Sequence, residues 1–147
     1  MLRLSTRGCY GVRAMVELAL HFGEKPVLMR TIADNQGISR KYLHALLTSL
    51  KVAGYVRSVR GAGGGYVLAR DPASIRINEV LGVLEGSLCI TDCVQDPATC
   101  DRSERCVTHN LWLKMSSAID QLLAEVTLQD LVTEHAANAA DSAMYHI

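Results

Sequence analysis

Hydrophobic residues recur with helical spacing from the start of the chain. In the stretch TRGCYGVRAMVELALHFG, steps of three and four residues place apolar side chains on one face, which predicts an amphipathic helix ending near Gly23. The positions on this face are Cys9, Val12, Met15, Val16, Ala19 and Leu20. The stretch LMRTIADNQG then predicts a short helix, with Ile32 and Ala33 facing inward and Gly37 as the turn residue.

The next stretch, ISRKYLHALLTSLKVAG, predicts a helix capped by Ser39 and stopped by Gly54. Its expected buried stripe consists of Leu43, Leu46, Leu47 and Leu50. Its outer side carries Arg40, Lys41, His44, Thr48 and Lys51. Two helices joined by a glycine-containing turn, the second capped by serine and rich in cations, are typical of a helix-turn-helix.

Two short β-prone runs surround a glycine-rich turn in YVRSVRGAGGGYVLARDP, which predicts a β-hairpin. A hairpin directly after a recognition helix is a wing. Arg57 and Arg60 before the turn, and Arg70 beyond it, lie where a wing meets phosphates or the minor groove. The glycines do not fit a nucleotide-binding loop, because Tyr66 follows them instead of a Lys-Ser/Thr pair or the last fingerprint glycine.

After the wing, IRINEVLGVLEG predicts a helix up to Gly86, and a second long helix is predicted from Val107 to Val126. The long helix repeats apolar residues at Leu111, Met115, Ala118 and Leu122, a stripe that Trp112, Ile119, Leu123 and Val126 widen. So broad a stripe predicts a partner helix from a second subunit. The alternative is a core helix lying on its own domain, and the two can hold for different sides.

The fold class expected from these elements is mainly α with a small β-hairpin wing. Residues 1–86 form a winged helix-turn-helix domain and residues 87–109 a cysteine-rich loop. Residues 110–135 form a dimerisation helix and a short C-terminal helix, and residues 136–147 a flexible tail.

Charge divides the chain although the total is balanced. Residues 1–70 hold eleven Lys and Arg against three Asp and Glu, a net charge of +8. Residues 71–147 hold four against twelve, a net charge of −8. The basic half is therefore expected to meet a polyanion, and the alternative is two solvated faces of opposite sign.

Four of the five cysteines and one histidine lie in CITDCVQDPATCDRSERCVTH, from Cys89 to His109. Neither a signal-peptide pattern nor an apolar run of membrane-spanning length is found, which predicts a cytoplasmic protein with reduced thiols and no membrane partner. In that setting clustered cysteines indicate metal binding or redox chemistry more often than disulfides. No catalytic constellation is found, so an enzyme is not expected.

The stretches LSTRGCYGVRAM, IADNQGISRKYLHALLTSLKVAGYVRSVRGAGGGYVLAR and RCVTHNLW resemble the IscR-type bacterial iron–sulfur cluster regulators, over roughly residues 1–132. These regulators are winged-helix transcription factors in a family that also contains NsrR and CymR. The resemblance implies a cytoplasmic bacterial homodimer that binds a palindromic operator in double-stranded DNA. It also implies that an iron–sulfur cluster modulates this binding in response to cluster supply or to redox, oxidative or nitrosative signals.

The ligand pattern of such regulators is three cysteines and a histidine in this loop. Cys106 and His109 match the C-x-T-H-x-L-W motif, and Cys100 has the expected spacing to Cys106. Six residues separate Cys93 from Cys100, where the pattern has five, and Cys89 is additional. The histidine favours [2Fe–2S] over the four-iron cluster of the nitric-oxide-sensing NsrR branch, and CymR lacks the cysteine block.

Other interpretations of the cysteine-rich loop stay open. The same four groups could hold a structural zinc ion, and Cys89 with Cys93 could form a zinc knuckle. A thiol switch without metal is a further alternative. Cys9 lies where some relatives carry a carboxylate that completes the cluster of the other subunit. Its spacing with Val12 and Val16 favours a core cysteine instead.

The resemblance also implies DNA contacts. Ser39 and Tyr42 match positions that touch DNA, and Arg60 with Gly61 matches the wing. We expect these residues to bind DNA together with Arg40, Lys41, His44 and Arg57, each cation having a solvated helix face as its alternative. His44 stands where IscR-type regulators carry a glutamate that discriminates between operators, so their operator preference is not carried over.

Overall fold

The computed structural model of this chain describes residues 3–144, and its architecture is mainly helical. The helices and strands are α1 (Thr6–Leu20), α2 (Met29–Gln36), α3 (Arg40–Val52), β1 (Val56–Val59), β2 (Gly65–Leu68), α4 (Ile77–Glu85), α5 (Asp92–Gln95), α6 (Val107–Glu125) and α7 (Leu128–Met144). Short 3-10 helices are η1 (Pro72–Ser74), η2 (Pro97–Thr99) and η3 (Ser103–Arg105). The expected fold class is confirmed.

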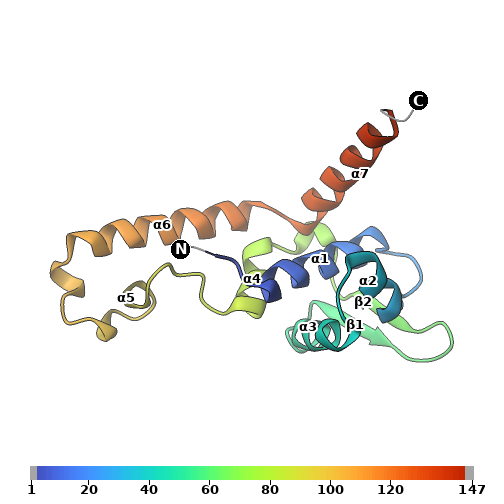
Figure 1. Ribbon diagram of the computed structural model, residues 1–147, viewed down its shortest axis with the longest axis horizontal. Coiled ribbons are helices and arrows are strands. Elements are labelled where there is room, and N and C mark those ends of the chain that lie inside the picture. The colour runs from blue at the N-terminus through green and yellow to red at the C-terminus, as the bar shows by residue number, and fades with distance from the viewer. Residues whose placement is uncertain (1–2, 145–147) are drawn as a thin grey trace.

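Figure 1 shows that α1 to α4 and the hairpin form one packed body, which we call the reading unit (residues 6–85). From this unit α6 extends as a long arm. The cysteine-rich segment folds beneath the far end of the arm, away from α3 and the hairpin (Figure 1). Helix α7 leaves the near end in another direction. The cysteine-rich segment therefore lies away from the expected DNA-binding helix α3 (Figure 1).

The helices of the reading unit begin and end close to the predicted residues, although α1 ends at Leu20, before Gly23, and α3 at Val52, before Gly54. Ser39 caps α3, and its hydroxyl accepts a hydrogen bond from the backbone N–H of Tyr42. Helix α2 ends at Gly37 in a left-handed conformation. The turn between α2 and α3 is therefore short enough to form a helix-turn-helix.

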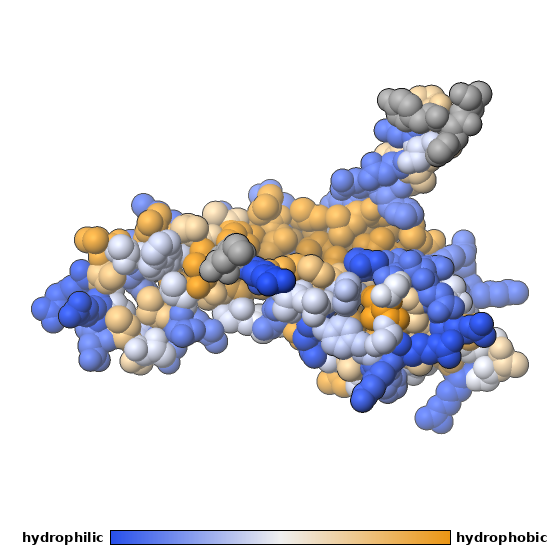
Figure 2. Space-filling model, viewed as in Figure 1, coloured by the Kyte–Doolittle hydropathy of each residue, from blue (hydrophilic) through white to orange (hydrophobic). Residues whose placement is uncertain are grey.

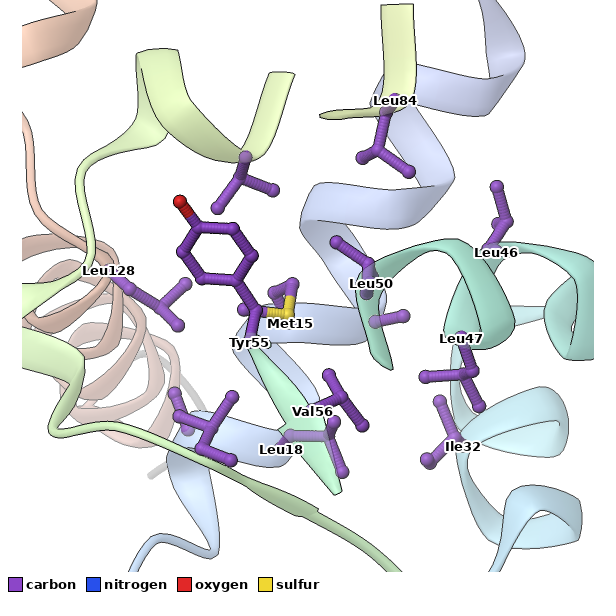
Figure 3. Packing of buried hydrophobic residues seen from close by; sticks show 14 of the residues in the cluster. Met15, Leu18, Ile32, Leu46, Leu47, Leu50, Tyr55, Val56, Leu84 and Leu128 are labelled. Atoms are coloured by element: carbon purple, nitrogen blue, oxygen red, sulfur yellow. The ribbon is translucent and has the colours of Figure 1, made fainter. Parts of the chain in front are cut away.

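A hydrophobic core fills the reading unit. All four leucines of the predicted stripe of α3 are buried. Figure 3 shows Leu47 and Leu50 directed toward side chains of neighbouring elements, including Ile32 of α2 and Met15 of α1. Leu128 at the start of α7 is also fully buried in this core. At about 25 cal/mol per Å² of apolar surface, each such side chain contributes roughly 1.5–3 kcal/mol.

The inward face of α1 differs from the prediction. Its buried positions include Gly8, Gly11, Met15 and Leu18, which repeat at helical spacing, whereas Cys9 is exposed. The expectation that Cys9 is a core cysteine is therefore wrong. The large apolar side chains of Val12 and Val16 suggested that their side of α1 faces inward. The side that packs closely against α4 is instead the one that carries Gly8 and Gly11.

The predicted stripe of α6 divides into two sides. Trp112, Ile119, Leu123 and Val126 are half-buried against their own chain. Leu111, Met115, Ala118 and Leu122 are exposed. The link to the reading unit continues beyond the helix, where Ile77 donates to the carbonyl of Val126 and Leu128 donates to that of Ile75. The arm thus uses one side of α6 within the chain and leaves the other side uncovered.

The C-terminal segment also differs from the prediction of a short helix followed by a flexible tail at 136–147. Helix α7 continues to Met144, and residues 145–147 lie outside the described range. Five alanines in AANAADSAM give this segment a high helix propensity although its side chains are exposed. Among residues 3–144, no helix combines the length and the apolar character needed to cross a membrane.

Candidate nucleic-acid interface and metal centre

The N-terminal turn of α3 presents polar side chains to solvent. Arg40, Lys41 and His44 are all exposed, and the first turn contains no acidic residue. Positive charge at a helix N-terminus adds to the partial charge of the helix itself, so this end attracts anions such as phosphate. The arrangement suits a helix that enters a groove of DNA by its N-terminal end.

Tyr42 has a different environment from its exposed neighbours. It is half-buried, its ring packs edge-on against Tyr10 with 6.1 Å between ring centroids, and its hydroxyl lies 3.3 Å from Thr6 Oγ1. Tyr42, which is predicted to contact DNA, therefore also anchors α3 to α1.

A buried carboxylate fixes α2 against α1. Glu17 is 5% exposed and accepts hydrogen bonds from Asn35 Nδ2 and Gln36 Nε2, both at 2.7 Å. Arg13 donates to the side-chain and backbone oxygens of Gln36. This network was not predicted from the sequence, where its only signal is a carboxylate at Glu17 within an apolar stretch of helix.

The hairpin places two predicted cations in solvent. Strands β1 and β2 pair antiparallel, with Val56 opposite Leu68 and Val59 opposite Gly65. Arg57 and Arg60 are exposed, and Gly61 lies at the turn with φ of +110°. Lys51 Nζ donates to Ser58 Oγ at 3.0 Å and so ties α3 to the wing.

The glycine run has a steric explanation. Gly65 has φ of +151°, and a Cβ there would lie 2.4 Å from the carbonyl oxygen of Val27. That approach allows backbone hydrogen bonds in both directions between Val27 and Tyr66. A Cβ on Gly64 would similarly lie 2.3 Å from Val59 O. These glycines therefore build the wing and hold it to the α1–α2 connection.

The cysteine-rich loop is folded into short turns. Cys93 lies in α5, which packs against α6, and Cys100 follows η2. Cys106 follows η3 and is the residue before α6. The side-chain hydroxyl of Ser103 donates to the carbonyl of Pro97 at 3.0 Å, so the two 3-10 turns lie together. These three cysteines are half-buried and Cys89 is exposed.

His109, in the first turn of α6, is the only buried residue of the segment 87–125. Its Nδ1 atom has no hydrogen-bond partner among the described residues. An unpartnered buried nitrogen costs free energy, which a ligand to that nitrogen would recover. The donor types and this orphaned nitrogen fit a metal centre.

The thiol of Cys106 is also adapted to the ionised form. Its Sγ lies 3.0 Å from the hydroxyl of Thr108, and this hydrogen bond, with those from the backbone of His109 and Thr108, lowers the pKa of the thiol. A thiolate is the form that binds metal. However, no three His, Cys, Asp or Glu side chains between residues 3 and 144 come together at metal-binding spacing. Ligand binding at this loop thus requires the turns between the cysteines to close.

An apolar surface runs along the arm. Figure 2 shows hydrophobic residues gathered over α6. Leu111 is 50% and Leu122 63% exposed, and Leu113 and Met115 are exposed as well. Exposed apolar side chains gathered on one helix mark an interaction surface more often than isolated ones do.

Comparison with known proteins agrees with these features. The Rrf2 family model, described as an iron-dependent transcriptional regulator, matches residues 4–134. The transcriptional regulator IscR of Vibrio parahaemolyticus is 42% identical over 134 residues, which cover 91% of this chain and 79% of that protein.

Two solved structures share the fold. IscR of T. potens has a TM-score of 0.76 and 42% identity, over 91% of this chain and 88% of that one. CymR, the global cysteine regulator of B. subtilis, has a TM-score of 0.77 and 36% identity, over 91% of this chain and 98% of that one. The backbone alone therefore does not distinguish between these two kinds of regulator.

Proposed function

The chain belongs to the Rrf2 family of transcriptional regulators, and from this premise we propose that its DNA binding is modulated by an iron–sulfur cluster in the cysteine-rich loop. It is a DNA-binding regulator and not an enzyme. We place the protein in the bacterial cytoplasm, where its DNA is. The proposal specifies a cofactor, four ligands, a dimer and a set of DNA contacts, each of which has its own support.

The observation that carries the cofactor is His109, a buried imidazole whose Nδ1 lacks a partner among the described residues. We propose that it binds iron together with Cys93, Cys100 and Cys106. Three thiolates and a histidine suit a [2Fe–2S] cluster, whose potential is raised because a neutral imidazole replaces one thiolate. Such a centre can change its oxidation state with redox signals, and it can be filled or empty according to the supply of clusters in the cell.

The chain's own residues would transmit that occupancy. Cys93 belongs to α5 and His109 to α6, so their ligation to one centre would fix the loop against the arm. Cys106 would bind as a thiolate, a form that its Thr108 hydrogen bond already favours. If the protein with a filled loop and the protein with an empty loop bind DNA with different free energies, cluster binding changes the affinity for DNA. By the same factor, DNA binding then changes the affinity for the cluster.

DNA reading is assigned to α3 and the wing. Ser39, Arg40, Lys41, Tyr42 and His44 would enter the major groove at the N-terminal end of α3. On the wing, Arg57, Arg60 and Gly61 would contact phosphates or the minor groove. The exposure of these cations and the charge of +8 on residues 1–70 support this assignment.

The dimer is proposed through the exposed side of α6. Leu111, Met115 and Leu122 would pack against the same residues of a second copy, which would cover the surface seen in Figure 2. Two copies related by a two-fold axis present two reading units, and this symmetry matches a palindromic operator in double-stranded DNA.

One alternative keeps the fold and changes the cofactor. A zinc ion held by the same four groups, or a thiol switch without metal, would also use the loop, and an NsrR-like nitric oxide sensor would hold a four-iron cluster. These alternatives need a direct test for two reasons. The chain shares its fold with CymR, and the candidate ligands in residues 3–144 do not stand together at metal-binding spacing.

The experiment is purification without oxygen, followed by visible absorption and iron, sulfide and zinc content per chain. The proposal expects a coloured protein with about two iron and two sulfide atoms per chain. His109→Ala and Cys93→Ala should lose the colour, whereas Cys89→Ala, the matched control outside the ligand set, should keep it. A colourless protein with one zinc, or with no metal after reconstitution, would reject the cluster.

A further inference from the structure

The last residue of α4, Glu85, places its carboxylate on the first turn of α1. Its Oε1 atom accepts hydrogen bonds from Ser5 Oγ at 2.6 Å, from Ser5 N at 3.2 Å and from Gly8 N at 2.9 Å. Ser5 is itself the N-cap of α1. The start of α1 is therefore held twice, once by its own cap and once by a residue 77 positions after Gly8.

The electrostatics of this contact join two helix ends. Helix α1 has no acidic residue in its first turn, so Glu85 supplies the negative charge that a helix N-terminus favours. The same carboxylate stands at the C-terminal end of α4, where the helix dipole disfavours an anion. Glu85 is thus poorly placed for α4 alone and well placed for binding α4 to α1.

Two glycines make the close approach possible. A Cβ on Gly8 would lie 2.2 Å from Glu85 Oε1, and a Cβ on Gly11 would lie 2.2 Å from Leu84 Cδ1. Both glycines are buried and stand three residues apart on one face of α1. The TRGCYG stretch is therefore shaped to receive the end of α4.

The other contacts of the first turn of α1 reach α3. Arg7 Nη2 donates to Ser49 Oγ at 2.8 Å. Thr6 Oγ1 lies 3.3 Å from the hydroxyl of Tyr42, in the turn of α3 that carries the exposed cations. A displacement of this first turn would therefore be felt at both the beginning and the later part of α3.

On its other side Glu85 adjoins the cysteine-rich loop. Gly86 follows with φ of +81°, and the loop begins at residue 87. Three residues into the loop, Ile90 N donates to Ser116 Oγ of α6. Helix α4 packs against both α1 and α6. Glu85 is therefore the residue at which the loop leaves the reading unit.

We propose that Glu85 is the positioning residue that couples the cysteine-rich loop to α3. A change in the path of the loop moves the Glu85 carboxylate against Ser5 and Gly8, and the first turn of α1 passes the movement to α3 through Thr6 and Arg7. This inference rests on the proposed control of DNA binding by the loop. It adds a residue that contacts neither the metal ligands nor DNA.

The test compares wild type, Glu85→Gln and Glu79→Gln. For each, the dissociation constant for one labelled duplex, selected from a random-sequence pool by repeated binding, is measured with and without the cluster at the same salt concentration. Glu85→Gln keeps the side-chain volume and removes the charge from the three hydrogen bonds. Glu79→Gln is the matched control, because Glu79 is on the same helix and accepts from Tyr55 OH instead of α1.

We expect the two dissociation constants of wild type to differ by at least about fivefold. In Glu85→Gln they should agree within about twofold, while Glu79→Gln keeps the wild-type ratio. An unchanged ratio in Glu85→Gln would overturn the coupling and leave the proposed function standing. A ratio of one in wild type would reject the proposed function, and the coupling with it.

A second variant and a cluster-free measurement keep the inference testable on its own. Gly8→Ala retains the charge of Glu85 and favours the helix, but its Cβ displaces the carboxylate from the first turn. In cluster-free protein, amide hydrogen exchange of residues 39–44 should quicken in Gly8→Ala and in Glu85→Gln and stay unchanged in Glu79→Gln. Unchanged exchange in the first two variants would show that the contact does not reach α3, whatever the loop binds.

Discussion

Residues 6–85 and residues 87–125 are held together in different ways. Every fully buried hydrophobic residue of the described chain lies between Ala14 and Leu84, apart from Leu128. In residues 87–125 the only buried residue is His109. The reading unit is stabilised by its own core, whereas the loop and the arm have little core of their own.

The difference indicates where regulation can act. Segments with few buried apolar contacts open at a lower free-energy cost than segments of a core, and sensing elements are drawn from them. Here the turns of the loop rest on local hydrogen bonds such as that from Ala98 N to Asp96 Oδ1. A bound metal and a second subunit would add to the arm the stabilisation that the reading unit obtains from burial.

The largest expected effect comes from opening the core of the reading unit. Leu50 is fully buried, so Leu50→Ala should lower the free energy of unfolding by about 2–5 kcal/mol. Val52, on the same helix, is 85% exposed, so Val52→Ala should change the free energy of unfolding by no more than about 0.5 kcal/mol. Urea unfolding measures both. Similar losses in the two variants would contradict the assignment of the core.

The next effect concerns the uncovered side of the arm. Leu122→Asp would place an unpaired charge in the proposed dimer interface and should weaken the dimer by at least about tenfold. Val52→Asp adds the same charge at an apolar position that is exposed on the reading unit and should leave the dimer intact. Sedimentation equilibrium distinguishes them, and equal dimer dissociation constants would place the interface elsewhere.

A smaller effect is expected on the salt dependence of DNA binding, and it should differ between arginines of the basic half (residues 1–70) and of the acidic half (residues 71–147). Arg60→Ala should reduce the slope of log affinity against log salt concentration by about one, because one phosphate contact is lost. Arg102→Ala, also an exposed arginine but in the acidic half, should leave the slope unchanged. Titrations of cluster-free protein with the selected duplex measure both slopes. A reduced slope in Arg102→Ala would extend the DNA surface to the loop.

The smallest effect lies where the arm joins α7. Thr127 N donates to Asp130 Oδ2. This hydrogen bond, with a further one from the Thr127 side chain, lowers the pKa of Asp130. A lowered pKa in the folded state stabilises the protein above the ordinary carboxyl pKa of 3.8, and the contribution is lost as pH falls through the lowered value. Asp130→Asn should therefore be less stable than wild type at neutral pH.

The difference in stability between wild type and Asp130→Asn should narrow at low pH, as the Asp130 carboxylate of wild type becomes protonated. Thermal unfolding of both proteins from about pH 6 downward measures it. A difference that persists unchanged at the acid end would mean that Asp130 stabilises α7 by some means other than its charge.

Much of the reading unit was predictable because its signals are local. The leucine stripe of α3, the cap at Ser39 and the hairpin follow from spacing and turn residues within a few positions. The inward face of α1 was not predictable from apolar bulk, because glycines line it. Glu85 was missed for a related reason, since its partner Gly8 is 77 residues away and no local pattern joins them.

The candidate metal site stays a prediction from residue type, and its conformation could not be predicted. The spacing of the cysteines and His109 indicates candidate donors, but it does not determine how a polar loop folds without its ligand. The burial of His109 with an unpartnered nitrogen is a structural finding that no sequence pattern contains. The helical continuation of α7 to Met144 was missed because exposed alanines gave no apolar stripe.

The central claim, that the loop controls DNA reading, is tested most directly by one affinity comparison. Fluorescence anisotropy of the selected duplex is measured with wild-type protein that carries the cluster and with cluster-free protein, at about 0.15 M salt. We expect dissociation constants at least about fivefold apart in wild type, and no such difference in His109→Ala. Equal affinities, in a preparation shown to retain its iron and sulfide, would contradict it.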